Sequence, residues 1–144
     1  MLAAKLARLF KFSKVYRDPL SAIAGIKDGS FLLVGGFGFS GVPMNLVNAV
    51  RLSGCRDLTV ASNSCGVDGQ SLEDDWGLSM LLRTRQIKRL IFSHLGENVE
   101  AQRQYFNGEL ELDVCPQGTF AEKIRCGGAG IPAFFTPTGA GTVV

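Results

Sequence analysis

The sequence of 144 residues lacks the residue patterns that several functions require. It has one histidine and no C-x-x-C pair among its four cysteines, so it offers no cluster for a metal site. No apolar run approaches the roughly 20 residues of a transmembrane helix. The net charge of +2 comes without a basic stripe carrying interleaved aromatic residues, which argues against nucleic acid as a partner. These absences leave a soluble globular domain, with no membrane and no nucleic acid expected among its partners.

Acidic residues are also missing from the first 17 positions, where five basic residues occur before Asp18. On a helical wheel, three leucines and Phe10 share one arc of this stretch, and the basic residues lie on the other side. An amphipathic, basic and acid-free leader is typical of a mitochondrial presequence. We therefore predict a targeting leader at residues 1–17, for the mitochondrial matrix or a related organelle, and one folded domain at residues 18–144. A surface helix is the alternative for the leader.

The densest glycine cluster follows the first predicted strand, residues 31–34. Four glycines occur within residues 35–41, and Pro43 stands at the expected first position of a helix. Glycine lets backbone N–H groups come close to a ligand, and the N-terminus of a helix favours an anion. The pattern predicts a loop that binds a phosphate-bearing ligand.

Two familiar nucleotide-binding motifs nearly fit this loop, and both fail. Residues 36–41 satisfy G-x-G-x-x-G, but the next strand, residues 58–61, is followed by no carboxylate before Asp68. A dinucleotide site would need an acidic residue where that strand closes. A P-loop would need Lys and Ser/Thr after its last glycine, where Val42 and Pro43 stand.

Apolar periodicity predicts strands that alternate with helices along the rest of the chain. This alternation predicts an α/β fold with a layered, largely parallel sheet and flanking helices. Helices are expected at residues 18–26, 43–54, 77–84, 98–106 and 116–125, the last one stopped by Gly127 and Gly128; strands are expected at 31–34, 58–61, 88–93, 109–114 and 133–136; residues 64–75 are expected to form a loop.

The loop and its surroundings resemble family I coenzyme A transferases, and within that family the 3-oxoacid CoA-transferases. The resemblance covers nearly the whole chain after the leader. It is carried by Asp28-Gly29, three apolar residues, Gly35-Gly36-Phe37, Gly41 and Pro43, and further on by Leu58-Thr-Val-Ala-Ser-Asn63, Leu81-Leu-Arg83, Gln86-Ile-Lys88, Gly96-Glu-Asn98, Arg103-Gln-Tyr105, Gly108-Glu-Leu-Glu111, Pro116-Gln-Gly-Thr119, Gly127-Gly-Ala-Gly130 and Pro137-Thr-Gly139.

The resemblance implies a fold shared with certain sugar-phosphate isomerases, and it implies that CoA moves from an acyl thioester to a free carboxylate. Succinyl-CoA is the implied donor and acetoacetate the implied acceptor, as in ketone body catabolism; another short acid is the nearest variant. Coenzyme A enters as the acyl-CoA substrate, and no permanently bound cofactor or metal is implied. The chain would be the amino-terminal half of such a transferase, truncated at its C-terminus. Its expected partner is a second-half domain or a complementary second subunit, in a homodimer or heterotetramer.

The resemblance also assigns roles to particular residues. The loop residues would contact CoA or acyl-CoA, and Asn63 and Gln117 would contact the reacting carboxylates; the loop residues are Gly35, Gly36, Phe37, Gly38, Phe39, Ser40 and Gly41. The family's glutamate nucleophile lies in Ser-Glu-Asn-Gly, which this chain lacks, so no catalytic residue is expected here. Glu97 is expected to be a carboxylate at a helix N-terminus.

Three other side chains fall near the expected site. Ser64 stands where many relatives have a second asparagine, so the resemblance does not specify which contacts this wall of the site makes. The single histidine, His94, has no Ser or Asp partner in the sequence and is expected to be structural. Most of the cysteines are expected to be buried free thiols, and Cys65 is the one whose position next to the site could make it reactive.

Two other functions stay open at this stage. The chain could be a non-catalytic module that binds acyl-CoA or pairs with a full-length transferase. A sugar-phosphate isomerase of the same fold is a third possibility, which the family motifs disfavour.

Overall fold

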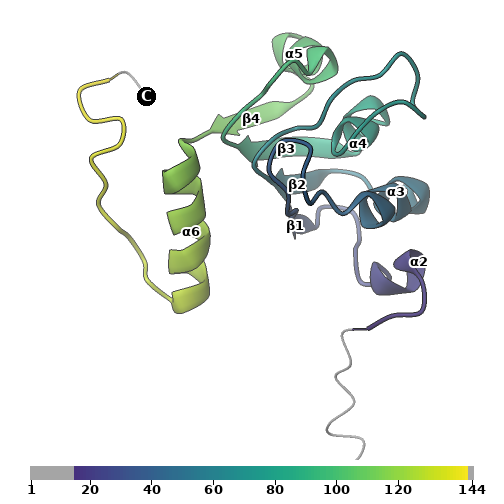
Figure 1. Cartoon of the computed structure of the whole chain (residues 1–144), viewed down its shortest axis with the longest axis horizontal. Coiled ribbons are helices and arrows are strands. Elements are labelled where there is room, and N and C mark those ends of the chain that lie inside the picture. The colour runs from purple at the N-terminus through teal and green to yellow at the C-terminus, as the bar shows by residue number, and fades with distance from the viewer. Residues whose placement is uncertain (1–14, 143–144) are drawn as a thin grey trace, which may run out of the picture.

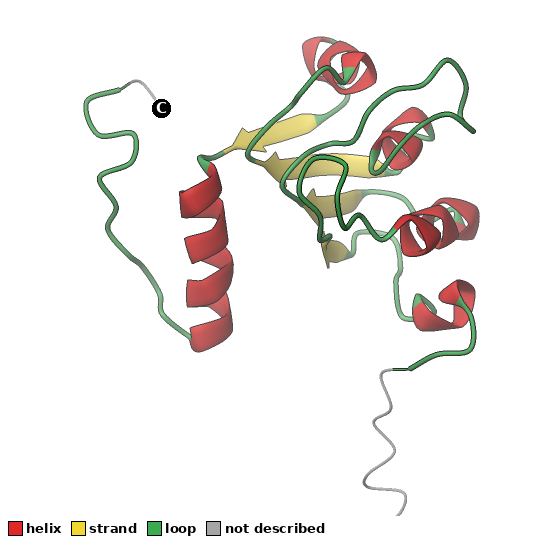
Figure 2. Cartoon of the chain, viewed as in Figure 1, coloured by secondary structure: helices red, strands yellow, loops and turns green. Residues whose placement is uncertain are grey.

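The computed structural model describes residues 15–142. A sheet of four parallel strands forms its centre, and Figure 2 shows helices alternating with these strands. The strands are β1 (Phe31–Leu33), β2 (Leu58–Ala61), β3 (Ile87–Phe92) and β4 (Glu111–Val114); the helices are α2 (Pro19–Ala22), α3 (Met44–Ser53), α4 (Ser79–Arg83), α5 (Val99–Phe106) and α6 (Gln117–Ala129). The predicted α/β class with a parallel sheet is confirmed.

The strands follow one another across the sheet in chain order, β1-β2-β3-β4. Right-handed crossovers in a constant direction place their connecting helices on one face of the sheet. Figure 1 shows α3, α4 and α5 together on one side of the sheet and α6 on the other. The sheet's inward row runs Leu32, Val60, Leu90 and Leu112 across the four strands. Side chains of α3 to α5 close this main core.

The opposite face of the sheet is only partly covered. Helix α6 packs there through Phe120, which forms a small second cluster with Ala61 and Cys115, and Ile91 packs against this cluster. A largely apolar groove of about 390 Å³ lies between α6 and this face. Phe31 and Leu33 of the edge strand β1 line the groove and remain 57% and 59% exposed.

The ends of several helices follow local sequence signals. Asp18 caps α2 by accepting a hydrogen bond from the Ser21 N–H, and Pro19 is the first helical residue. Asn98 caps α5 through the Ala101 N–H at 2.7 Å. Gly54 ends α3 in the left-handed conformation, with φ +71°. These caps satisfy backbone groups that the helices leave unpaired.

Two predicted boundaries near the glycine cluster are wrong. The first helix ends at Ala22 instead of continuing to residue 26, because Ile26 donates its N–H to Ile23 in a separate turn. Pro43 precedes α3 as its cap residue, so the first helical residue is Met44. Both differences shift an end and leave the element in place.

The C-terminal predictions differ more. Helix α6 continues through Gly127 and Gly128 and ends at Gly130, where φ is +70° and the Ile131 N–H donates to the Cys126 carbonyl. Glycine weakens a helix by about 1 kcal/mol but does not forbid it, and the left-handed residue sets the end. The strand expected at residues 133–136 is absent from the described structure. This segment stands clear of the sheet in Figure 1, so it has no neighbouring strand to pair with.

The predicted leader lies almost wholly outside the described residues, which begin at Val15. Of its final residues, Arg17 contacts Asp18 in an exposed ion pair at 3.6 Å. Between residues 15 and 142, no helix combines the length and apolar character needed to cross a membrane.

Candidate functional site

The candidate site lies at the carboxyl edge of the sheet. Parallel strands all end on the same edge, which is where open α/β sheets bind ligands. The glycine loop follows β1, Asn63 lies two residues after β2, Ser93 directly follows β3, and Gln117 begins α6 just after β4. Four segments that are far apart in the sequence therefore meet in one place.

The glycine loop is a tight turn held by its own backbone. Phe37 and Ser40 exchange N–H to carbonyl hydrogen bonds of 2.9 and 3.0 Å, which close a turn over Gly38 and Phe39. Gly38 has φ +55°, in the left-handed region. Within the described structure, the N–H groups of Gly36, Phe39 and Gly41 have no protein acceptor. The loop therefore leaves backbone donors open beside the sheet edge.

Gly36 is required by close packing as well as by conformation. Its φ is +121°, and a Cβ there would stand 2.8 Å from Cγ2 of Val42. Gly38 differs, because a Cβ at that position would meet open space. Gly36 thus shapes the loop, and Gly38 faces outward.

Three polar side chains link the loop to the other strand ends. The Gly38 N–H donates to Asn63 Oδ1 at 3.1 Å. Asn63 Nδ2 donates to Gln117 Oε1 at 2.8 Å and to Ser93 Oγ at 3.1 Å. Ser93 Oγ donates to Gln117 Oε1 at 2.5 Å. The oxygen of Gln117 therefore accepts two hydrogen bonds, and its NH2 group is left for another acceptor.

A hollow of about 380 Å³ lies next to this network. Gly38 and Phe39 form one wall of it, and the exposed side chains of Trp76, His94 and Glu97 are also in the lining. Aromatic surface with a few polar groups is typical of a site for a small organic ligand.

Comparison with known proteins decides the family. The coenzyme A transferase family profile matches residues 17–144. The chain belongs to the coenzyme A transferase family. It is 54% identical over 133 residues to one subunit of the succinyl-CoA:3-ketoacid coenzyme A transferase from Xanthomonas campestris, covering 92% of this chain and 52% of that protein. It is 50% identical over 129 residues to the mitochondrial enzyme 2A of Mus musculus, covering 90% of this chain and 24% of that protein.

Solved structures agree on the fold of this coenzyme A transferase chain. Glutaconate coenzyme A-transferase from Acidaminococcus fermentans superposes with a TM-score of 0.72 at 20% identity, over 90% of this chain and 40% of that one. An acyl-CoA transferase from Escherichia coli O157:H7 gives 0.69 at 20% identity, over 86% of this chain and 24% of that one. The transferase chain spans about half the length of its bacterial relatives and about a quarter of the mammalian ones.

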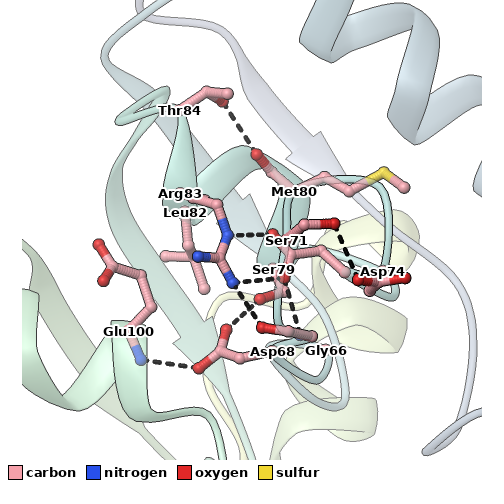
Figure 3. Close-up of polar contacts among 12 residues, drawn as sticks. Gly66, Asp68, Ser71, Asp74, Ser79, Met80, Leu82, Arg83, Thr84 and Glu100 are labelled. Carbon is pink, nitrogen blue, oxygen red and sulfur yellow. Dashed lines mark hydrogen bonds and ion pairs between the residues drawn. The ribbon is translucent and has the colours of Figure 1, made fainter.

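The segment between β2 and α4 is held against the rest of the domain by buried polar contacts. Figure 3 shows the Asp68 carboxylate between the Ser79 hydroxyl and the Glu100 N–H, which joins the loop to α4 and α5. Asp75, fully buried, pairs with Arg83 at 2.5 Å and also accepts the Gly69 N–H. These contacts fix the loop that carries Trp76 to the hollow.

Cys65 is not the reactive thiol that its position suggested. It is fully buried, and its thiol donates to the Leu95 carbonyl at 2.8 Å. Burial raises the pKa of Cys65 to about 12, so the thiol stays protonated at neutral pH. All four cysteines lie within the described residues and are free thiols, Cys55 half-buried and the other three buried.

Glu97 and His94 both line the hollow beside the site. Glu97 directly precedes Asn98, the cap of α5, so it lies at a helix N-terminus as expected, and it also lines the hollow. His94 is exposed at the end of β3 and shares that hollow, so no core contact explains it.

Sequence reasoning placed Gly35–Gly41, Asn63 and Gln117 in one site, and the structure brings the loop, Asn63 and Gln117 together. Their contact with CoA or a carboxylate stays a prediction. Ser93 and Trp76 were missed. Ser93 could have been found as a polar residue directly after a buried strand, the position that Asn63 also approaches. No local signal in the sequence marks Trp76, which lies beside the hollow only because of the path of the loop between β2 and α4. Among the described residues no group of three side chains could hold a metal.

Proposed function

We propose that this chain forms the coenzyme-binding part of a 3-oxoacid CoA-transferase, which moves CoA from succinyl-CoA to acetoacetate. The observation that carries the proposal is the meeting of the glycine loop, Asn63 and Gln117 at the strand ends of a chain about half identical to such enzymes. Open backbone donors of Gly35–Gly41 would hold the acyl-CoA. The Gln117 NH2 would bind the reacting carboxylate or the thioester oxygen.

The nucleophile has to come from outside these 144 residues. A glutamate attacks the thioester in the family reaction, giving an anhydride and then a glutamyl thioester, and its Ser-Glu-Asn-Gly motif does not occur here. An amide at position 117 suits this chemistry, since it can stabilise an oxyanion without pairing with the nucleophile as a cation would. We therefore propose a second-half domain or a complementary second subunit as the partner, within a homodimer or heterotetramer.

A hybrid enzyme tests this proposal. Residues 17–144 replace the matching stretch of the related Xanthomonas campestris subunit, and the hybrid is co-expressed with the remainder of that enzyme. We expect transfer of CoA from succinyl-CoA to acetoacetate, followed by the absorbance of acetoacetyl-CoA. Gln117→Ala should lower turnover about 100-fold, the effect of losing one oxyanion donor. Gln102→Ala, on α5 and outside the hydrogen-bond network of the site, is the matched control.

The alternative is a non-catalytic module that binds acyl-CoA or pairs with a transferase, which the missing motif favours. An inactive hybrid that still binds succinyl-CoA by calorimetry would support this alternative. A folded hybrid that neither transfers CoA nor binds succinyl-CoA would contradict both the transferase function and the acyl-CoA-binding module.

We also propose that residues 1–17 direct the chain to the mitochondrial matrix or a related organelle. The acid-free basic leader supports this, as do the mitochondrial relatives of Mus musculus, whereas the bacterial relatives are equally similar. Residues 1–17 fused to a fluorescent protein should enter mitochondria. Replacing Lys5, Arg8 and Lys11 with Glu should abolish import. Cytosolic fluorescence of the unchanged fusion would contradict the localisation.

A further inference from the structure

The direction of the hydrogen bonds around Gln117 is set by a group that cannot be reversed. A backbone N–H can only donate, and the Gly38 N–H points at the Asn63 side chain at 3.1 Å. The atom facing Gly38 must therefore be the Asn63 oxygen. This choice turns the Asn63 NH2 toward Gln117 and Ser93.

Both hydrogens of the Asn63 NH2 are then used. One goes to Gln117 Oε1 at 2.8 Å and the other to Ser93 Oγ at 3.1 Å. Ser93 accepts that hydrogen bond, and its single proton has two acceptors in range: Gln117 Oε1 at 2.5 Å and the Asn63 carbonyl at 3.0 Å. The shorter contact assigns the proton to Gln117.

The consequence for Gln117 is that its oxygen is occupied from two sides. A primary amide that rotated by half a turn would bring its NH2 against the Asn63 NH2, two donors facing each other. The amide is thus held in one orientation, with two N–H donors facing outward from an exposed position at the start of α6.

We propose that Ser93 is a positioning residue, which together with Asn63 locks Gln117 as a two-hydrogen donor for an acceptor-only group, a carboxylate or a thioester oxygen. This inference rests on the proposed transferase function and adds to it the residue that sets the orientation of the donor. Asn63 accordingly acts through Gln117, because its own NH2 has no hydrogen left for a substrate. These hydrogen bonds hold the Gln117 amide before any ligand binds, so the amide does not have to reorient during the reaction.

The first test reads the amide itself, in the 144-residue chain without any partner. The carbon of the Gln117 side-chain carbonyl, assigned by its loss in Gln117→Ala, reports the hydrogen bonds that the oxygen accepts. Ser93→Ala should move this carbon signal upfield, and Ser93→Thr, which keeps the hydroxyl, should restore it. Ser53→Ala is the matched control, because Ser53 also donates to a carbonyl but lies at the far end of α3. An unmoved Gln117 signal in Ser93→Ala overturns the inference.

The second test uses the hybrid transferase with the same variants. Ser93→Ala should lower kcat about tenfold while KM for succinyl-CoA changes less than about twofold, since donor orientation matters most in the transition state. Ser93→Thr should recover most of the rate, and Ser53→Ala should lose none. Equal rates for Ser93→Ala and the unchanged hybrid, or a Thr variant as slow as Ala, would overturn the inference. An inactive unchanged hybrid would count against the proposed function alone, because the carbon signal of the Gln117 carbonyl still tests the role of Ser93 without any activity.

Discussion

Gly36 and Gly38 belong to one loop but differ in what a side chain would do. Alanine at position 36 needs a backbone conformation that residues other than glycine avoid, and its Cβ would press on Val42. Such a conformation costs on the order of 1–3 kcal/mol. Gly38 is in the left-handed region with free space around it, where asparagine is tolerated.

We therefore expect Gly36→Ala to lower the free energy of unfolding by about 2 kcal/mol or more, and Gly38→Asn by well under about 1 kcal/mol. Urea unfolding of the chain measures both. In the hybrid enzyme, Gly38→Asn should keep the fold and weaken acyl-CoA binding, since the added side chain extends into the wall of the hollow. Unchanged binding by calorimetry would show that the loop is a turn without ligand contact.

Cys65 gives the protein a defined response to alkaline pH. Its ordinary pKa is 9.0, and burial raises the pKa in the folded state to about 12. Below pH 9 the thiol is protonated in both states, so its contribution to stability is fully present. Between pH 9 and pH 12 the unfolded chain loses a proton that the folded chain retains, and stability falls.

We expect the free energy of unfolding to decline with pH above 9 more steeply in the unchanged chain than in Cys65→Ala. The difference in slope is at most about 1.4 kcal/mol per pH unit. Urea unfolding over a pH series measures both slopes, and lysine and tyrosine titrations cancel in the comparison. Identical slopes would contradict a buried, protonated thiol.

At the scale of elements, the loop between β2 and α4 depends on the ion pair of Asp75 and Arg83. The Asp75 side chain is fully buried and the Arg83 side chain is 34% exposed. The aspartate raises the pKa of Arg83 through their hydrogen bonds. A carboxylate left alone in this position has no solvent to stabilise it.

Arg83→Met should therefore lower the free energy of unfolding by about 3–5 kcal/mol, because it leaves the buried Asp75 carboxylate without its ion-pair partner. The matched control is Arg89→Met, whose partner Asp113 on the neighbouring strand is partly exposed, so the loss should stay within about 1 kcal/mol. Chemical unfolding separates the two. Hydrogen exchange should also rise in residues 64–78 of Arg83→Met alone, and equal costs for both variants would contradict the structural role of the buried pair.

At the scale of the whole molecule, the half-covered sheet predicts association. Phe31 and Leu33 lie in an apolar groove on an edge strand, and such surfaces attract other chains. We expect the isolated chain to be inactive and to self-associate, as measured by light scattering after gel filtration. Leu33→Lys should reduce association.

Phe135→Ser is the control for this prediction, since Phe135 is fully exposed but lies outside the groove. Association that survives Leu33→Lys and disappears in Phe135→Ser would place the contact elsewhere. Co-expression with the remainder of a transferase should suppress association if that remainder covers the groove.

Strong local signals in the sequence predicted most of the elements. Short apolar runs and apolar periodicity depend on neighbours within a few residues, so they identified β1 to β4 and α3 to α5 with errors at the ends. These signals are local because they arise from backbone conformation and side-chain periodicity. Asn63 and Gln117 were predicted from the resemblance to the coenzyme A transferases, which periodicity and spacing do not supply.

The rest required the tertiary structure, because it depends on contacts between distant segments. Whether residues 133–136 form a strand is decided by the presence of a neighbour, and the described fold provides none. The protonation of Cys65 follows from burial by residues far along the chain. Gln117 acquires its orientation only when Gly38, Asn63 and Ser93 arrive from three other strand ends, a convergence that spacing in the sequence does not encode.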